Sequence, residues 1–138
     1  MGTRLGMALV ALAVLAGCQS GGGARVDEGA LPPLPPASAP KYQDVPVPFG
    51  FEYLPTKSFS TEGVGYRVGE LIYKGSANAL EVMKFYREQM PPNGWVEVRE
   101  ADIGSRAILL FKKQQESCIV IIERGSLLSS TMVRVWIH

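Results

Sequence analysis

Four short apolar segments in the C-terminal part of the chain lie too close together in sequence to be joined by crossovers. Two of the connections between them, at residues 102–105 and 114–117, are polar and of hairpin length. A parallel neighbour needs a crossover of a dozen or more residues, so these segments must pair as antiparallel strands. The predicted strands cover residues 95–100, 107–112, 118–122 and 132–137.

An amphipathic helix that begins after Asn78 is the clearest single element. Glu81 follows Asn78 at the spacing of a capping box. Proline cannot continue a helix, so the Pro91-Pro92 pair ends it, and Asn93-Gly94 can form the turn that follows. The helix needs a sheet to cover its apolar face, which recurs at helical spacing and comprises Ala79, Val82, Met83, Tyr86 and Met90, with Phe85 at its edge.

The segment before the helix predicts one more strand. Residues 66–74 are rich in tyrosine, valine, leucine and isoleucine, which favour strands. Residues 50–56 are compatible with a short edge strand, and residues 57–65 are typical of a loop. The predicted fold class is therefore α+β, with one amphipathic helix packed on a mainly antiparallel sheet of about five strands. The order of the strands stays open.

The N-terminal residues are typical of an export signal. Arg4 is followed by an apolar stretch over residues 5–15. A helix needs about 20 apolar residues to span a bilayer, so this stretch is too short for an anchor and fits a signal peptide. The sequence therefore predicts a signal peptide over residues 1–17.

The signal ends in Leu15-Ala16-Gly17-Cys18, which resembles the lipobox of bacterial lipoprotein precursors. The resemblance implies cleavage between Gly17 and Cys18 and attachment of lipid to the Cys18 thiol. Lipoproteins of this family carry two or three acyl chains, palmitate among them, and two chains are enough for stable anchoring. The alternative is a plain signal peptide that happens to end near a cysteine.

The residues after Cys18 bear on the location of the expected lipoprotein. In Gram-negative members of the family, an aspartate directly after the cysteine often marks retention in the inner membrane. Gln19 and Ser20 follow here instead. We therefore expect a lipoprotein of the cell envelope, placed in the outer membrane and facing the periplasm if the organism is Gram-negative.

A proline-rich stretch predicts a tether between the lipid and the folded domain. Seven of the ten prolines fall between Pro32 and Pro48, after a run of three glycines at residues 21–23. We expect residues 18–48 to form a flexible linker, with the globular domain over residues 49–138. An extended stretch from Leu31 to Pro48 reaches about 55 Å. The alternative reading of residues 31–36 is a docking peptide for an aromatic groove.

Charge and chemistry exclude several classes of function. The chain has a net charge of +1 and no basic run, which argues against a nucleic-acid partner. Its one histidine, His138, has no expected partner, and Cys118 lies within an apolar segment where a thiol is commonly a small core residue. We expect no catalytic residues, no metal ligands and no cofactor. An enzymatic alternative, of hydrolase type, would need Glu70 or Asp102 to meet a tyrosine only on folding.

One spacing pattern in the domain is familiar. It comprises Tyr66, Gly69, Tyr73, Gly75, Phe85-Tyr86, Met90 and Gly94-Trp95. The pattern resembles an uncharacterised domain of small bacterial lipoproteins, over residues 44–137. The resemblance implies a fold and carries no activity with it. Packing of Tyr86 and Trp95 explains these residues physically.

Together these features predict a membrane-anchored envelope lipoprotein whose domain is a non-enzymatic binding or assembly module. The expected partner is an envelope protein, peptidoglycan or lipid. The alternative is a purely structural envelope component without a specific ligand. One candidate contact surface is the sheet face away from the helix, which bears residues from among Arg67, Arg99, Arg134 and Trp136. The face that each of these residues takes stays open.

Overall fold

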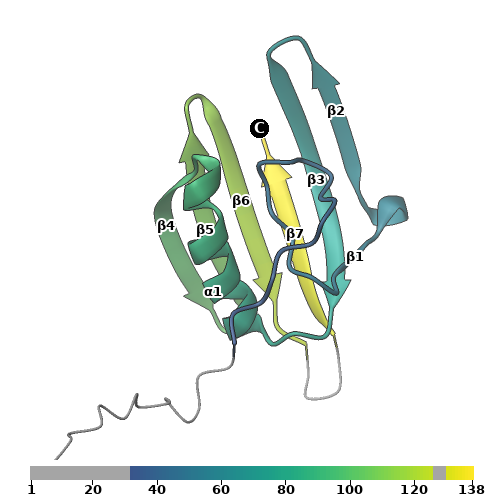
Figure 1. The fold of residues 1–138 in the computed structure, drawn as a ribbon, viewed down its shortest axis with the longest axis vertical. Coiled ribbons are helices and arrows are strands. Elements are labelled where there is room, and N and C mark those ends of the chain that lie inside the picture. The colour runs from purple at the N-terminus through teal and green to yellow at the C-terminus, as the bar shows by residue number, and fades with distance from the viewer. Residues whose placement is uncertain (1–31, 126–129) are drawn as a thin grey trace, which may run out of the picture. The chain divides into compact units, whose positions relative to one another are not determined.

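The computed structural model describes residues 32–125 and 130–138, which form an antiparallel sheet with one α-helix (Figure 1). The structure confirms the predicted α+β class, although the sheet has seven strands instead of about five. Two short 3-10 turns, Pro55–Lys57 and Pro91–Asn93, complete the secondary structure. The main elements are β1 (Glu52–Tyr53), β2 (Phe59–Gly63), β3 (Tyr66–Gly75), α1 (Ala79–Gln89), β4 (Val96–Ile103), β5 (Arg106–Lys113), β6 (Glu116–Glu123) and β7 (Thr131–Ile137).

The strand order, which the sequence left open, is β1-β3-β7-β6-β5-β4, and β2 also pairs with β3. Strands β4 to β7 form a meander, and every pairing in the described residues is antiparallel. Helix α1 connects β3 to β4 at the opposite edge of the sheet. The connection through α1 is long enough to cross the sheet.

The predicted loop at residues 57–65 is wrong, because most of it forms β2. This strand pairs with β3 from Phe59 opposite Glu70 to Gly63 opposite Tyr66. Gly65, with φ of 77°, makes the turn between the two strands. Serine, threonine and glycine in β2 resemble loop composition, and the strand has a neighbour on one side only, so no buried residue marks it in the sequence.

The helix agrees closely with its prediction. The Asn78 side chain accepts a hydrogen bond from the Glu81 backbone at 2.9 Å, and the Glu81 carboxylate accepts one from the Asn78 backbone at 3.1 Å. These two bonds are the predicted capping box. Phe85, expected at the edge of the apolar face, is fully buried, and Gly94 with φ of 86° ends the turn after the helix.

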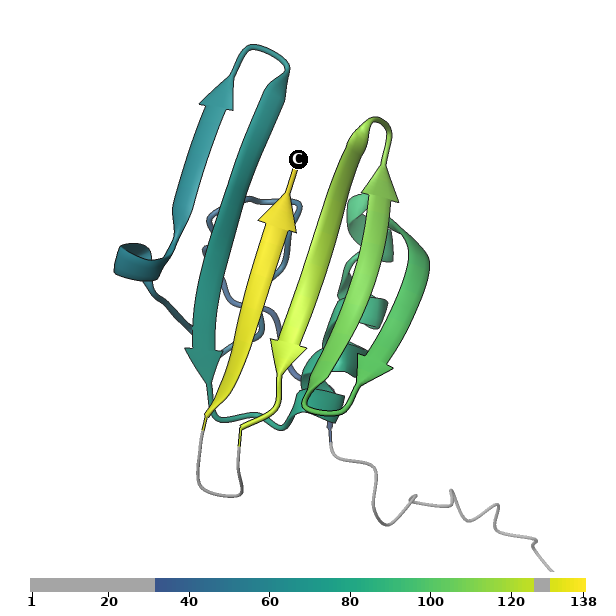
Figure 2. The ribbon, with the colours of Figure 1, turned by 180° about the vertical axis from the view of Figure 1, so that it is seen from behind.

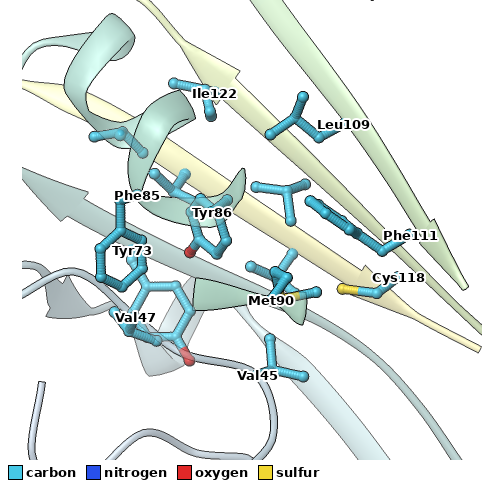
Figure 3. Close-up of a cluster of buried hydrophobic side chains, with 14 of the residues drawn as sticks. Val45, Val47, Tyr73, Phe85, Tyr86, Met90, Leu109, Phe111, Cys118 and Ile122 are labelled. Atoms are coloured by element: carbon cyan, nitrogen blue, oxygen red, sulfur yellow. The ribbon is translucent and has the colours of Figure 1, made fainter. Parts of the chain in front are cut away.

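The core lies between the sheet and the elements that cover one of its faces (Figure 3). Helix α1 covers β4, β5 and β6 in Figure 1. Tyr86 and Phe85 pack edge to face, with ring centroids 5.3 Å apart, above the strands. The strand residues beneath them are fully or almost fully buried and include Leu109, Phe111, Cys118, Val120, Ile122, Val133 and Val135.

The other half of this face, over β7 and β3, is covered by residues 32–51, the N-terminal segment (Figure 1). Tyr42, Val45 and Val47 of this segment are at most 6% exposed. Its backbone pairs with itself, because the amide of Ala37 donates to the carbonyl of Val47 at 2.8 Å. Proline lacks an amide donor, so such a segment can lie on a sheet through its side chains alone.

This packing corrects the predicted linker from residue 32 onward, since residues 32–48 belong to the folded unit, which was expected to begin at residue 49. The proline content suggested an extended, solvated chain, and the apolar residues at positions 42, 45 and 47 were too few to suggest burial. The predicted signal peptide and the first part of the predicted linker, residues 18–31, lie outside the described residues.

Replacing Val47 by alanine tests whether the N-terminal segment contributes to stability. Val47 is 3% exposed, so we expect Val47→Ala to lower the free energy of unfolding by roughly 1–3 kcal/mol through lost burial. Phe49, two residues later, is 69% exposed, and Phe49→Ala serves as the control with an expected change within about 0.5 kcal/mol. Urea unfolding followed by circular dichroism measures both. Equal and negligible effects would contradict the packed segment.

Candidate binding surface

The sheet face opposite α1, here called the open face, is not covered by any helix or segment of the described residues (Figure 2). Residues paired across antiparallel strands point to the same face, so the register assigns each side chain. One row crosses the open face from β2 to β4 and comprises Phe59, Glu70, Trp136, Ile119, Leu110 and Arg99. The next row comprises Ile72, Arg134, Ile121, Ile108 and Ala101.

Exposed apolar side chains gather on the open face near the β2–β3 hairpin. The rings of Phe59 and Trp136 pack edge to face with centroids 6.4 Å apart, yet the two residues remain 52% and 39% exposed. Val68 is 39% exposed and Tyr66 58% exposed on the same face. These four residues, the aromatic patch, form the kind of exposed apolar cluster that marks interaction sites.

Charged groups on the open face compensate one another. Arg134 forms an ion pair with Glu70 at 2.9 Å and lies 3.9 Å from Glu123. Arg106 contacts the same Glu123 carboxylate at 3.2 Å. The four charges of Glu70, Glu123, Arg106 and Arg134 on the open face are therefore paired with one another.

Three of the four residues predicted for this surface lie on it, namely Arg99, Arg134 and Trp136. The fourth, Arg67, is on the covered face. Arg67 lies on the same face of β3 as Leu71 and Tyr73, which are buried beneath the N-terminal segment. The alternation in this hairpin pointed to neither answer reliably, because its apolar residues Tyr66 and Val68 lie on the open face and its charged residue Arg67 lies on the covered one.

Arg67 is the centre of an ion network with the N-terminal segment. Its guanidinium donates two hydrogen bonds to Asp44, both at 2.7 Å, and two to Glu116, at 2.7 and 2.9 Å. Lys113 contacts Asp44 from the other side at 2.8 Å. Two-pronged contacts of this kind are the strongest type of charge-assisted hydrogen bond. We call these residues, together with Tyr42 and Trp95, the Arg67 cluster.

Aromatic rings enclose the cations of this cluster. The Arg67 guanidinium lies 4.9 Å from the ring centre of Tyr42 and 5.9 Å from that of Trp95. The Trp95 indole, 1% exposed, donates a hydrogen bond to the backbone carbonyl of Asp44 at 2.8 Å. The cluster therefore fastens the N-terminal segment to β3, β5 and β6, with Trp95 as the bridge from the end of the helix.

The hydrogen bonds from Arg67 hold the pKa of Asp44 well below its usual value. Burial opposes this shift, and Lys113 adds to it. A carboxylate held ionised between two cations cannot exchange a proton near neutral pH, so its role is structural rather than acid–base.

The two acids that the enzymatic alternative would use lie on opposite faces of the sheet. Glu70 lies on the open face of β3, whereas Asp102 lies on the covered face of β4 and pairs with Arg124 at 2.5 Å. Burial raises the pKa of the Cys118 thiol to about 12, which keeps it protonated. Among the described residues, no group of histidine, cysteine, aspartate and glutamate side chains is placed to hold a metal ion.

Two hollows accompany these surfaces. One, of about 220 Å³, lies between the N-terminal segment, including its Phe51, and the residues Tyr53 and Tyr73. The other, of about 200 Å³, lies beside the hairpin, lined by Tyr66, Glu116 and other residues that include His138. Both are open to solvent and shallow.

The residues predicted for lipid attachment and cleavage, Cys18 and Gly17, lie outside the described residues. Within residues 32–125 and 130–138, no helix combines the length and the apolar character needed to cross a bilayer.

A family model described as START domain-like matches residues 56–130, which is more than half of the chain. The chain belongs to the START domain-like family. The matched part runs from the 3-10 turn before β2 to the residue before β7, so this START domain-like region contains the hairpin and α1 and excludes the N-terminal segment. No curated protein and no solved structure matches the chain significantly.

Sequence reasoning missed Asp44 and Tyr42 because both fall in the predicted linker. It also missed Phe59 and Val68 of the aromatic patch. Their signal was an alternation in which Phe59, Thr61, Tyr66 and Val68 share one face of a hairpin, but the polar residues between them concealed it.

The lowered pKa of Asp44 predicts a pH-dependent stability. Its carboxylate contributes fully above the ordinary aspartate value of 3.8, and this contribution is lost as pH falls toward the lower folded value. We expect Asp44→Asn to lower the free energy of unfolding at pH 7 by roughly 1–3 kcal/mol. Between about pH 5 and pH 3, the variant should lose less stability than the wild type.

Urea unfolding at a series of pH values measures this difference. Asp102→Asn, which removes an exposed ion pair, is the control, and its pH dependence should match that of the wild type. Parallel curves for wild type and Asp44→Asn would show that the network does not hold the N-terminal segment.

Proposed function

We propose that this chain is a lipid-anchored module of the cell envelope that binds a partner through the open face of its sheet and performs no catalysis. The anchor rests on the lipobox-like Leu15-Ala16-Gly17-Cys18. The binding role rests on the aromatic patch, which is the observation that carries the proposal.

In this proposal, acylation of Cys18 anchors the exported chain to a membrane. Each buried methylene contributes about 0.8 kcal/mol, so two or three acyl chains hold a protein on a membrane effectively permanently. Gln19, in place of an aspartate, favours the outer membrane in a Gram-negative cell.

The aromatic patch favours binding of an uncharged or mixed-polarity surface. Phe59 and Trp136 pack on each other without being covered, whereas apolar strand residues of the covered face such as Leu109 are fully buried. Aromatic side chains are enriched in interfaces, where they bury a large area at a small entropic cost. The paired charges around Arg134 supply hydrogen-bonding groups without net charge.

The chemistry of the described residues supports binding over catalysis. Asp44 is held as an anion by Arg67 and Lys113, and Cys118 is held as a thiol by burial. Neither group can act as a base or nucleophile near neutral pH. The acidic candidates Glu70 and Asp102 lie on different faces and are each paired with an arginine.

Replacing Cys18 tests the anchor. Cells that express the wild-type chain should incorporate labelled palmitate into it, and the chain should partition into the detergent phase. Cys18→Ser should lose both properties, whereas Cys118→Ser should lose neither. Wild-type chain that carries no label, or a mature product that retains residues 1–17, would overturn the anchoring half of the proposal.

Replacing the aromatic patch tests the binding half. In a detergent extract of the envelope, the tagged wild-type chain should retain a partner that Phe59→Ser and Trp136→Ser retain at least tenfold less. Val96→Ser is the matched control, because Val96 is 67% exposed on the same face at the far edge of the sheet. Thermal unfolding of each variant checks that the fold is kept. Equal retention by all three variants would contradict binding through the patch.

A further inference from the structure

The two edges of the sheet are protected to very different degrees. At one edge, β4 has a bulge between Glu97 and Arg99, and Arg87 of α1 forms ion pairs with Glu97 and Glu100. Bulges and charged side chains are the devices by which proteins prevent an edge strand from pairing with another chain. The β4 edge is therefore protected against pairing with a strand of another chain.

The edge formed by β2 has none of these devices. All five of its residues are exposed, its pairing with β3 is continuous, and Glu62 is its only charged residue. The hairpin also extends past the end of β7, which pairs with β3 only from Gly69 onward (Figures 1 and 2). Another strand can therefore approach the outer side of β2 freely.

The register shows which backbone groups of β2 point outward. The turn has two residues, Val64 and Gly65, so Gly63 and Tyr66 form the hydrogen-bonded pair that closes it. Hydrogen-bonded pairs alternate along antiparallel strands. The amide and carbonyl groups of Ser60 and Glu62 therefore point away from β3, toward solvent.

We propose that β2 pairs in antiparallel fashion with β2 of a second copy of this chain, about a two-fold axis at Thr61. This inference rests on the proposed function and names a partner for the aromatic patch. In this register Ser60 lies opposite Glu62 of the second copy, and the outward groups of both residues form four backbone hydrogen bonds across the axis. Thr61 lies opposite Thr61 of the second copy, and such a threonine pair is favourable between strands.

The side chains on the open face are complementary under the same symmetry. Phe59 lies opposite Gly63 of the second copy. The Tyr66 ring lies over Gly63, since a Cβ at Gly63 would come within 2.2 Å of it. Phe59 of each copy therefore meets Tyr66 of the other, which joins the two aromatic patches across the axis. An aromatic ring over an edge glycine is a recognised way to stabilise a strand pair.

Charge also permits this pairing. Opposite residues on the covered face are Ser60 and Glu62, so no like charges face each other across the axis. Glu62 retains Arg67 as its neighbour on β3. A five-residue strand pair buries little area, so the dimer in solution is weak. Anchoring both copies on one membrane raises their effective concentration and favours the pair.

Cysteine cross-linking tests the register. Thr61→Cys places two cysteines opposite each other across the axis, at a separation of about 4.5–5.5 Å between Cβ atoms, from which small backbone shifts allow a disulfide. The full-length chain, purified in detergent, is oxidised with copper phenanthroline and run on non-reducing gels. We expect at least tenfold more dimer from Thr61→Cys than from Val96→Cys, which like Thr61 is an exposed position on an edge strand. Cys118 is fully buried, and the wild-type chain shows the background from the native cysteines. Equal dimer from both variants would overturn the proposal.

A second variant distinguishes a cross-link formed by paired β2 strands from one formed by random encounters of two chains. Ser60→Pro removes an outward amide that the sheet does not use, so the fold should persist, as proline is tolerated at such edge positions. Added to Thr61→Cys, it should lower dimer formation at least tenfold, whereas Ser60→Ala should not. Thermal unfolding confirms that both variants are folded. Cross-linking that Ser60→Pro leaves unchanged in a folded chain would contradict the pairing.

The results also distinguish this inference from the proposed function. If Thr61→Cys stays monomeric while Phe59→Ser still loses its partner from the extract, self-pairing is wrong and the patch binds another molecule. If Thr61→Cys forms the dimer, the self-pairing is supported whether or not Cys18 carries lipid.

Discussion

The structure depends on how helix α1 and the N-terminal segment together cover one face of a seven-stranded sheet. An eleven-residue helix is too short and narrow for the whole sheet, and it covers β4 to β6. The remaining strands, β7 and β3, are covered by a proline-rich segment that has few backbone hydrogen bonds with which to hold itself there. The ion network of Arg67 with Asp44, closed by Trp95, supplies the missing attachment. The network acts together with the burial of Tyr42, Val45 and Val47, which belong to the same core as Tyr73.

The predicted and observed folds differ in those segments whose structure depends on residues far away in the sequence. The helix was predictable because Asn78, Glu81 and Pro91 act locally, and the meander because its connections are short. The β2 hairpin and the N-terminal segment were not, because each depends on a distant partner. Phe59 is placed by Trp136, and Asp44 by Arg67 and Lys113, residues that are far away in sequence. Composition suggested loop and linker for these two segments, and the tertiary contacts overrode it.

The candidate surface was predictable only in part for the same reason. Alternation placed Arg134 and Trp136 on one face of a strand, but which face was open depended on the covering elements. Arg67 illustrates the difficulty, since its charge suggested an outward contact and the structure uses it inward. A lone arginine between strand residues carries no local sign of the carboxylates that it will meet.

The packed N-terminal segment also changes how an anchored copy would meet its neighbours. If Cys18 carries the lipid, the chain available as a tether ends near Leu31 instead of at Pro48, because the later residues lie on the sheet. Thirteen residues span at most about 45 Å when fully extended. A shorter tether confines the domain to a thinner layer above the membrane, and effective concentration rises as the accessible volume falls. If the proposed anchor at Cys18 is present, the ion network that holds the N-terminal segment also favours the proposed contact between neighbouring copies, because it shortens the tether between the lipid and the domain.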